Sequence, residues 1–145
     1  MFKIRELMTT PVYSLRETDT LQSARALMDK KRIRHVPITT GDNVFSGLIT
    51  NRDVLANTIS HLAGIDPDTQ NEIDAGIPLK EIMRTDVRTI SPDDLVKEAA
   101  FILYRNKYGC LPVVENGKLV GIVTEADFLQ LTVQLLEAMD QAEKQ

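Results

Sequence analysis

The 145-residue sequence has little of several residue types, and each shortage excludes a class of protein. Its single cysteine, Cys110, excludes an intramolecular disulfide and fits a reducing compartment. Positive charge is not in excess: the formal net charge is −4 and the pI about 5.2, which argues against a nucleic-acid binder. No apolar run approaches the roughly 20 residues that span a bilayer, and residues 1–6 lack the apolar stretch of a secretion signal. We therefore expect a soluble cytoplasmic protein that binds neither nucleic acid nor membrane.

Catalytic and metal-binding patterns are equally scarce. The two histidines, His35 and His61, are far apart, and no cysteine or acidic residue accompanies them at metal-ligand spacing, so we expect no metal site. Cys110 lies in an apolar stretch and is predicted to be a small core residue rather than a nucleophile. The sequence has no P-loop, nucleophile elbow or triad-like set. We accordingly predict that the protein is not an enzyme and needs no cofactor.

What the sequence does contain is an internal repeat. A shift of 75 residues places residues 8–12 over 83–87 and residues 36–38 over 111–113. After the loss of one residue, a shift of 74 places residues 47–53 over 121–127. The matches include proline, glycine, threonine and aspartate as well as apolar positions, so shared periodicity does not explain them. We infer a duplicated unit.

Each copy begins with a predicted short strand, near residues 12–15 and 87–90, followed by a helix. The helices have apolar residues at helical spacing. These residues are Leu21, Ala24, Leu27 and Met28 in the first copy, and Val96, Ala99, Ile102 and Leu103 in the second. In the second copy Ser91 followed by Pro92 predicts the helix start, with serine as the N-cap and proline as the first helical residue.

Two further strands and a second helix complete each copy. Asn116-Gly117 predicts a tight hairpin between the strands of the second copy, and residues 40–43 form the looser turn of the first. The closing helices are predicted to start near Thr50 and Thr124. The pattern is β-α-β-β-α twice, which predicts an α/β fold of the α+β type.

We place the first repeat at residues 1–62, a linker at 63–78, the second repeat at 79–131 and a helical extension at 132–145. Within the linker, residues 66–71 are polar and turn-rich, and we expect this stretch to be mobile. The last helix carries an apolar stripe that continues past the repeat. The stripe consists of Phe128, Leu131, Leu135, Leu136 and Met139. It can bury against its own domain or against a second copy, and we favour a homodimer.

The segments 47–53 and 121–127 share the pattern Gly-h-h-Thr-x-x-Asp, where h is apolar. One interpretation is a capping box, in which threonine caps the helix and the aspartate reaches back to its backbone. The other is a nucleotide site. Amides at a helix start attract phosphate, and an aspartate there can accept hydrogen bonds from both hydroxyls of a ribose. The two interpretations are compatible, and the spacing alone leaves both open.

The ordered set of motifs resembles a tandem cystathionine-β-synthase (CBS) domain pair, or Bateman module. The features that carry the resemblance are the Met-x-x-x-Val segments, the proline within an apolar strand and the Gly-h-h-Thr-x-x-Asp pattern, each present twice. Residues 109–114 followed by 117–121 are typical of the small stand-alone pairs of the acetoin-utilisation type. The resemblance covers about residues 3–131.

The resemblance implies two units packed about a pseudo-twofold axis, with clefts that bind AMP, ADP, ATP, S-adenosylmethionine or a related adenine compound. It places ribose contacts at Asp53 and Asp127, with Thr50 and Thr124 near ribose or phosphate. Residues that would flank the base are Val12, Val36, Pro37, Val87, Leu111 and Pro112. The first copy also carries Arg34, His35 and Arg52, which either favour a phosphorylated ligand there or form a solvated helix end that suits the helix dipole.

We therefore predict a ligand-sensing regulatory protein that acts by conformational change, read by a dimer partner or a separate effector protein. The alternative is a structural or protein-interaction module in which the threonine–aspartate pairs only cap helices and the clefts bind no ligand. A nucleotide-processing enzyme is disfavoured, because no general base or metal cluster accompanies the predicted site.

Overall fold

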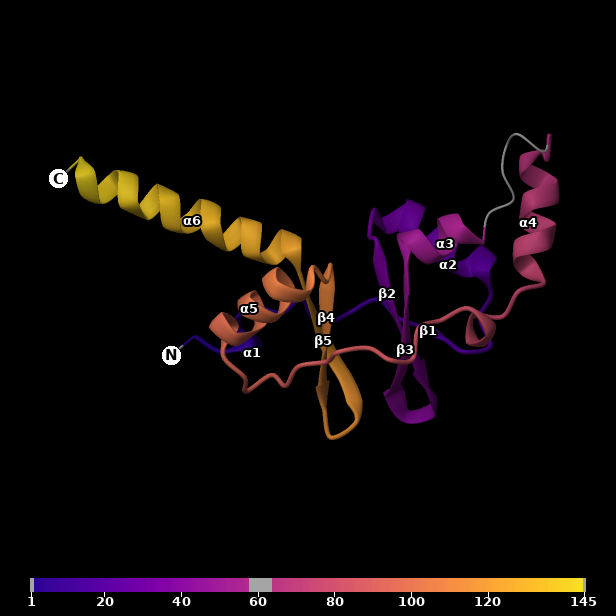
Figure 1. The fold of residues 1–145 in the computed structure, drawn as a ribbon, viewed down its shortest axis with the longest axis horizontal. Helices are drawn as coiled ribbons and strands as arrows, with labels where there is room; N and C mark the ends of the chain where they lie inside the picture. Colours follow the sequence, from indigo (N-terminus) through magenta and orange to yellow (C-terminus); the bar gives the residue numbers. More distant parts are fainter. Residues whose placement is uncertain (1, 58–63, 145) are drawn as a thin grey trace. The chain divides into compact units, whose positions relative to one another are not determined.

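The computed structural model describes residues 2–57 and 64–144, which form two compact units (Figure 1). Unit 1 consists of Met1–Val12, Arg88–Asn116 and Val120–Gln145, and unit 2 of Tyr13–Val87 and Gly117–Leu119. The N-terminal segment of the first repeat thus belongs to the unit built mainly from the second repeat. His61 lies outside the described residues.

In unit 2, strand β1 (Leu15–Arg16) runs parallel to β2 (His35–Thr40), which pairs antiparallel with β3 (Val44–Thr50). The helices are α2 (Leu21–Lys31), α3 (Asn51–Ala56) and α4 (Pro67–Ala75), and two 3-10 turns lie at Gly41–Asn43 and Leu79–Glu81. Thr20 caps α2 by accepting a hydrogen bond from the Ser23 amide at 3.3 Å. The buried core gathers apolar residues of α2, β2, β3 and α3, joined by Leu79.

In unit 1, the short helix α1 (Ile4–Leu7) and helix α5 (Val96–Asn106) accompany strands β4 (Cys110–Glu115) and β5 (Lys118–Thr124) and helix α6 (Glu125–Glu143). Strands β4 and β5 are hydrogen-bonded neighbours. The predicted tight hairpin between them is confirmed, because Asn116 and Gly117 both have positive φ, 54° and 79°. Ile4, from the N-terminal segment, is fully buried in this unit's core.

The predicted mixed α/β architecture is confirmed, and so is the helical periodicity of the first helix in each repeat. In α2, Leu21, Ala24 and Met28 are buried. The equivalent residues of α5, Val96, Ala99 and Leu103, are buried as well. One stripe on each helix therefore faces the core.

The predicted start of the second repeat's first helix at Ser91 is wrong, because α5 begins at Val96. The Ser91 amide donates to the Asp94 carboxylate at 2.9 Å, and the Asp94 amide donates to the Ser91 carbonyl at 3.1 Å. These bonds close a turn instead of a helical start. Leu95 is then held extended by an antiparallel bridge to Lys3. A helix-start signature can also specify a turn, and the long-range bridge decides between them.

The predicted first strands are shorter than expected. Val12 and Val87 lie outside any strand and are half-buried. Only Leu15–Arg16 forms a strand in the first repeat, and Ile90 makes an isolated parallel bridge to Val113 in the second.

The polar stretch 66–71, predicted as a turn-rich segment, is largely helical. Asp66 caps α4 by accepting from the Thr69 amide at 2.8 Å, and Pro67 is its first residue. On the same helix Asp74 is fully buried and accepts from Arg25 of α2 at 2.6 Å and from Gln70 at 2.7 Å. These contacts hold α4 against α2.

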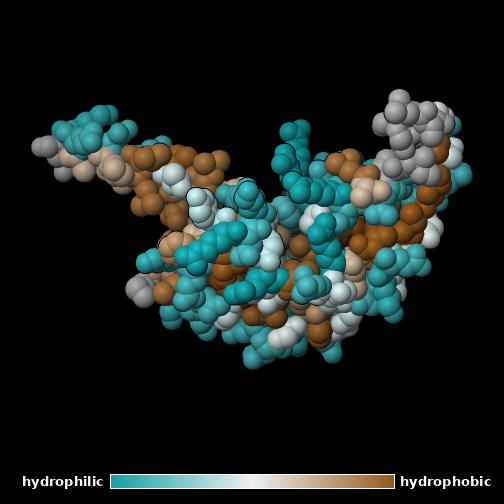
Figure 2. Space-filling model, in the orientation of Figure 1, coloured by the Kyte–Doolittle hydropathy of each residue, from teal (hydrophilic) through white to brown (hydrophobic). Residues whose placement is uncertain are grey.

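Helix α6 continues to Glu143, and none of its residues is buried. Figure 2 shows hydrophobic surface along α6, with a hydrophilic end at the C-terminus. Its large exposed apolar residues are Leu129, Val133, Leu135, Leu136 and Met139. Among the described residues, no helix combines the length and apolar character that crossing a membrane requires.

Candidate functional site

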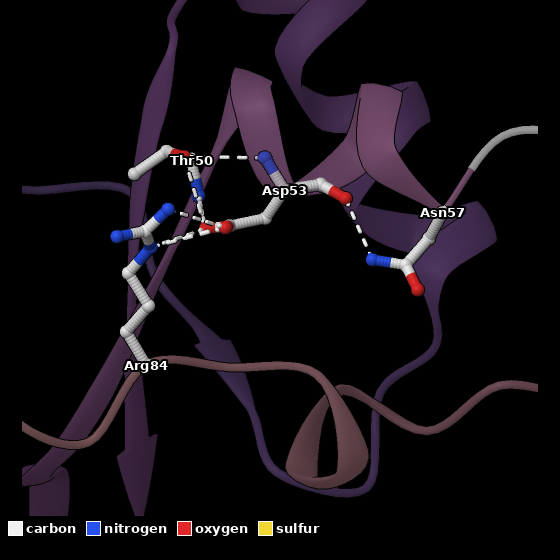
Figure 3. Close-up of polar contacts among 4 residues, drawn as sticks. All are labelled: Thr50, Asp53, Asn57 and Arg84. Atoms are coloured by element: carbon white, nitrogen blue, oxygen red, sulfur yellow. Dashed lines mark hydrogen bonds and ion pairs between the residues drawn. The ribbon is translucent and has the colours of Figure 1, made fainter.

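Each Gly-h-h-Thr-x-x-Asp motif forms a strand-to-helix turn closed by a capping box. Thr50 ends β3 and caps α3; its amide donates to Asp53 Oδ2 at 2.8 Å, and its hydroxyl donates to the same oxygen at 2.9 Å (Figure 3). Thr124 ends β5 and caps α6, with its amide 2.8 Å from Asp127 Oδ2. The predicted capping boxes are confirmed. They fix both aspartate side chains through the same oxygen, Oδ2.

The other carboxylate oxygen of each aspartate contacts a residue that the sequence analysis did not select. In unit 2, Asp53 Oδ1 lies 3.0 Å from both Nε and a terminal nitrogen of Arg84, Nε also lies 3.2 Å from Oδ2, and Figure 3 shows the guanidinium facing the carboxylate. In unit 1, Asp127 Oδ1 accepts from the Thr9 hydroxyl at 3.4 Å. Positions 9 and 84 coincide in the 75-residue repeat alignment. The contact is therefore repeated, with a cation in one unit and a hydroxyl in the other.

Backbone pairing brings these residues to the motifs. The Arg84 amide donates to the Leu48 carbonyl at 2.8 Å, and the Leu48 amide returns a bond of 2.9 Å. Thr9 pairs with Ile122 in the same way. A Cβ built on Gly47 would lie 2.6 Å from the Arg84 carbonyl oxygen, so only glycine admits this crossing. A Cβ built on Gly121 would lie 2.6 Å from the Met8 sulfur.

The Arg84 guanidinium sets the electrostatics of Asp53. Burial acts to raise the pKa of Asp53, but hydrogen bonds from Arg84 and Thr50 outweigh it and lower this pKa below its usual range. The same ion pair raises the pKa of Arg84. A depressed carboxylate pKa stabilises the fold above the ordinary carboxyl pKa. That contribution is lost as the pH falls through the lowered value. The Asp53 side chain is 12% exposed and that of Arg84 is 59% exposed, so the cation lies on the solvent side.

Backbone amides at the helix starts are less available to an anion than the sequence predicts, because several already donate hydrogen bonds to oxygens of the protein. The Asn51 amide, first in α3, donates to the Arg34 carbonyl at 2.8 Å. The Glu125 amide, first in α6, donates to the Gly109 carbonyl at 3.2 Å. The Asp53 amide donates to the Thr50 hydroxyl at 3.3 Å. Positive charge for a phosphate in unit 2 therefore has to come mainly from side chains.

The remaining predicted site residues divide between the units. Unit 2 contains Arg34, His35, Val36, Pro37, Arg52 and Val87 together with Thr50 and Asp53, and unit 1 contains Val12, Leu111 and Pro112 together with Thr124 and Asp127. The strand residues Val36, Pro37, Leu111 and Pro112 are buried, so they can offer a ligand backbone groups more readily than side chains. Arg34 and Arg52 are exposed. The assignment of these residues to a ligand site stays a prediction.

The polar groups of each motif are hydrogen-bonding groups held in fixed positions. The described residues contain no group of three or more histidine, cysteine or acidic side chains placed to hold a metal ion. Burial raises the pKa of the Cys110 thiol to about 12, which keeps it protonated and a poor nucleophile near neutral pH. Each site instead offers a fixed carboxylate, a hydroxyl and, in unit 2, a guanidinium. This set suits hydrogen bonding to a diol and, in unit 2, to an anion.

Comparison with known proteins identifies the repeat. The CBS domain family matches residues 4–59 and 79–133. Protein MJ1225 of Methanocaldococcus jannaschii is 32% identical over 128 residues, which are 88% of this chain and 42% of that longer protein. The crystal structure of a putative acetoin utilization protein, AcuB, from Vibrio cholerae is 35% identical, with a TM-score of 0.80 and 97% of each chain covered.

Two solved structures of the same fold contain adenosyl compounds. The CBS domain pair of protein MJ0100, in complex with 5′-methylthioadenosine and S-adenosyl-L-methionine, has a TM-score of 0.74 and 23% identity over 92% of this chain and 98% of that one. CBSX2 of Arabidopsis thaliana in complex with AMP has a TM-score of 0.77 and 21% identity over 93% of this chain and 98% of that one. At these identities the likeness establishes the fold.

Proposed function

The chain belongs to the CBS domain family, with two copies of the domain, and from this premise we propose that it is a ligand-sensing regulatory protein. Its ligand is an adenine nucleotide or adenosyl compound bound at the Thr-x-x-Asp motifs, in the clefts that the family resemblance implies. The observation that carries the proposal is the fixed orientation of the two carboxylates. In each unit Oδ2 serves the helix cap, and Oδ1 accepts from a ribose hydroxyl once the ligand displaces Arg84 from Asp53 or Thr9 from Asp127. The AMP, methylthioadenosine and S-adenosylmethionine in solved structures of this fold support the ligand class.

Binding without turnover is the mode of action we propose. The described motifs provide fixed hydrogen-bonding groups, whereas the one cysteine is buried and protonated near neutral pH. A ligand that prefers one conformation of the protein shifts the population toward it, and an effector protein reads the shift. The location in the cytoplasm and the effector remain predictions of the sequence.

The test is ligand-induced thermal stabilisation, with AMP, ADP, ATP and S-adenosylmethionine as probes. A ligand at 100 times its Kd is expected to stabilise the wild type by about 2.7 kcal/mol. Asp53→Ala and Asp127→Ala each lose the stabilisation that depends on their own site. Each variant also loses a capping box, at a cost of about 0.5–2 kcal/mol, so the measured quantity is the shift of each variant with and without ligand.

Asp140→Ala is the matched control, since Asp140 is an exposed aspartate on α6 that lies outside both motifs. It is expected to keep the full ligand-induced shift. If none of the four compounds stabilises the wild type, the sensor proposal is wrong and the interaction-module alternative takes its place.

We further propose that α6 mediates homodimerisation. Residues 134–143 of α6, here called the α6 tail, contain Glu137, Asp140 and Glu143 but no basic residue. The α5–α6 groove of unit 1 combines two basic residues and several aromatic side chains with one acidic residue, Glu125. Its lining includes Lys97, Phe101, Tyr104, Lys107, Phe128 and Thr132. The acidic, apolar tail is complementary to this groove, and we assign the tail of a second copy as its occupant.

Replacing Leu135 and Met139 together with glutamate is expected to weaken the dimer by roughly 100-fold or more, because each buried side chain of this size contributes about 1.5–3 kcal/mol. Sedimentation equilibrium measures the dissociation constant. Gln141→Glu adds one negative charge to the same tail without removing an apolar side chain, and is expected to have a small effect. A wild type that stays monomeric at high concentration contradicts the proposal.

A further inference from the structure

The side chain that contacts Oδ1 of the motif aspartate differs in charge between the two sites. Position 84 places an arginine against Asp53, and position 9 places a threonine against Asp127. The Asp53 site therefore carries a balanced carboxylate–guanidinium pair. The Asp127 site carries a carboxylate for which the described residues supply no ion-pair partner. Both positions make the same pair of backbone hydrogen bonds, to Leu48 and to Ile122, so the contact with each aspartate differs mainly in the side chain.

A ribose bound to Asp53 has to compete with Arg84 for the Oδ1 atom. The Arg84 backbone is held to Leu48 by two hydrogen bonds, whereas its side chain is 59% exposed and can rotate away. A ligand with a phosphate gives the displaced guanidinium a new anionic partner, with bidentate geometry. A neutral nucleoside gives it none, so binding such a ligand breaks an ion pair without replacing it.

The Asp127 site favours a ligand of the opposite kind, one without a phosphate. Its Thr9 hydroxyl bond is long, at 3.4 Å, and its donor is neutral like a ribose hydroxyl, so a ribose hydroxyl displaces it at small cost. The uncompensated carboxylate disfavours a nearby phosphate and favours a neutral or cationic ligand.

On the basis of the proposed function, we infer that the residue at repeat position 9/84 sets the ligand charge. The Asp53 site binds a phosphorylated adenine nucleotide, whose phosphate Arg84 binds on leaving Asp53. The Asp127 site binds an adenosyl compound without a phosphate. Arg84 is thus a specificity-determining residue for the site of the opposite repeat, in addition to any contribution from Arg34 or Arg52.

The experiment compares AMP with adenosine, which differ only by the phosphate, in isothermal titration calorimetry. Asp127→Ala leaves the unit 2 site alone, and Asp53→Ala leaves the unit 1 site alone. In the Asp127→Ala background, Arg84→Thr is expected to weaken AMP binding about 10- to 100-fold, the range for a lost charge-assisted hydrogen bond. Adenosine binding stays unchanged or strengthens. In the Asp53→Ala background, Thr9→Arg is expected to raise the preference for AMP over adenosine.

The outcomes separate this inference from the proposed function. If Arg84→Thr leaves the ratio of AMP to adenosine affinity unchanged while both ligands still bind, the charge assignment is wrong and the adenine site stands. If the wild type binds neither compound nor any other adenine ligand, the proposed function fails and the inference fails with it. Arg84→Lys keeps the charge without the planar fork and is expected to retain part of the AMP preference, which separates loss of charge from loss of packing.

Discussion

Arg25→Met is expected to lower the free energy of unfolding by about 3–5 kcal/mol, since it leaves the buried Asp74 carboxylate without its cation. Asp74 is fully buried, and it also accepts a hydrogen bond from the Gln70 side-chain amide at 2.7 Å. The Arg25 side chain is 25% exposed, so the two halves of the pair are not equivalent. Asp74→Leu should therefore cost less, because the Arg25 guanidinium is partly exposed and reaches water.

Urea unfolding measures this effect through the midpoint at constant slope. The double variant Arg25→Met/Asp74→Leu is expected to recover much of the loss, because it removes both charges from the interface of α2 with α4. Arg5→Met is the control. Its pair with Asp93 has a similar distance, 3.0 Å, but both side chains are more than half exposed, and we expect little change. A loss no greater than that of Arg5→Met would contradict the role assigned to the buried pair.

Leu111→Ala is expected to cost about 2–5 kcal/mol of stability, the range for a large aliphatic side chain removed from a packed core. Leu111 is fully buried between the other core residues of unit 1. The sequence resemblance assigned it to the wall of the base pocket, whereas its burial points to packing as its main role. The ligand affinity of the folded variant should therefore change less than its stability.

Chemical unfolding and calorimetry at a temperature where the variant is folded provide the two measurements. Tyr104→Ala is the control for lost apolar volume, because Tyr104 is 83% exposed and its removal leaves no cavity. A Leu111→Ala protein of nearly normal stability with abolished ligand binding would assign the side chain to the ligand site instead.

The elements that the sequence predicted well are those specified by local pattern. The stripes of α2 and α5 follow from residues three and four apart, and the Asn116-Gly117 hairpin follows from two residues that adopt positive φ. The caps at Thr50 and Thr124 are equally local. The start of α5 was misplaced because Leu95 is held extended by Lys3, far away in the sequence.

The site residues that the sequence did not predict, Arg84 and Thr9, are also placed by contacts between distant parts of the chain. Arg84 is separated from Asp53 by 31 residues, and Thr9 is separated from Asp127 by 118 residues. No periodicity or motif spacing measures such distances. The repeat alignment does place position 9 over position 84, and with Gly47 and Gly121 it marks where two backbones cross. Only the fold shows which aspartate each crossing segment reaches.

The crossing of the two segments also bears on how the chain can be divided. Each aspartate belongs to one repeat, while the side chain that contacts it is encoded at the beginning of the other. Cutting the chain at residues 63–78 would therefore yield two halves, each with an aspartate but without the segment that reaches it. A protein consisting of one such repeat would need a second copy to complete the same contacts. A substitution at position 84 or position 9 in one repeat therefore changes the contact made by the aspartate of the other repeat.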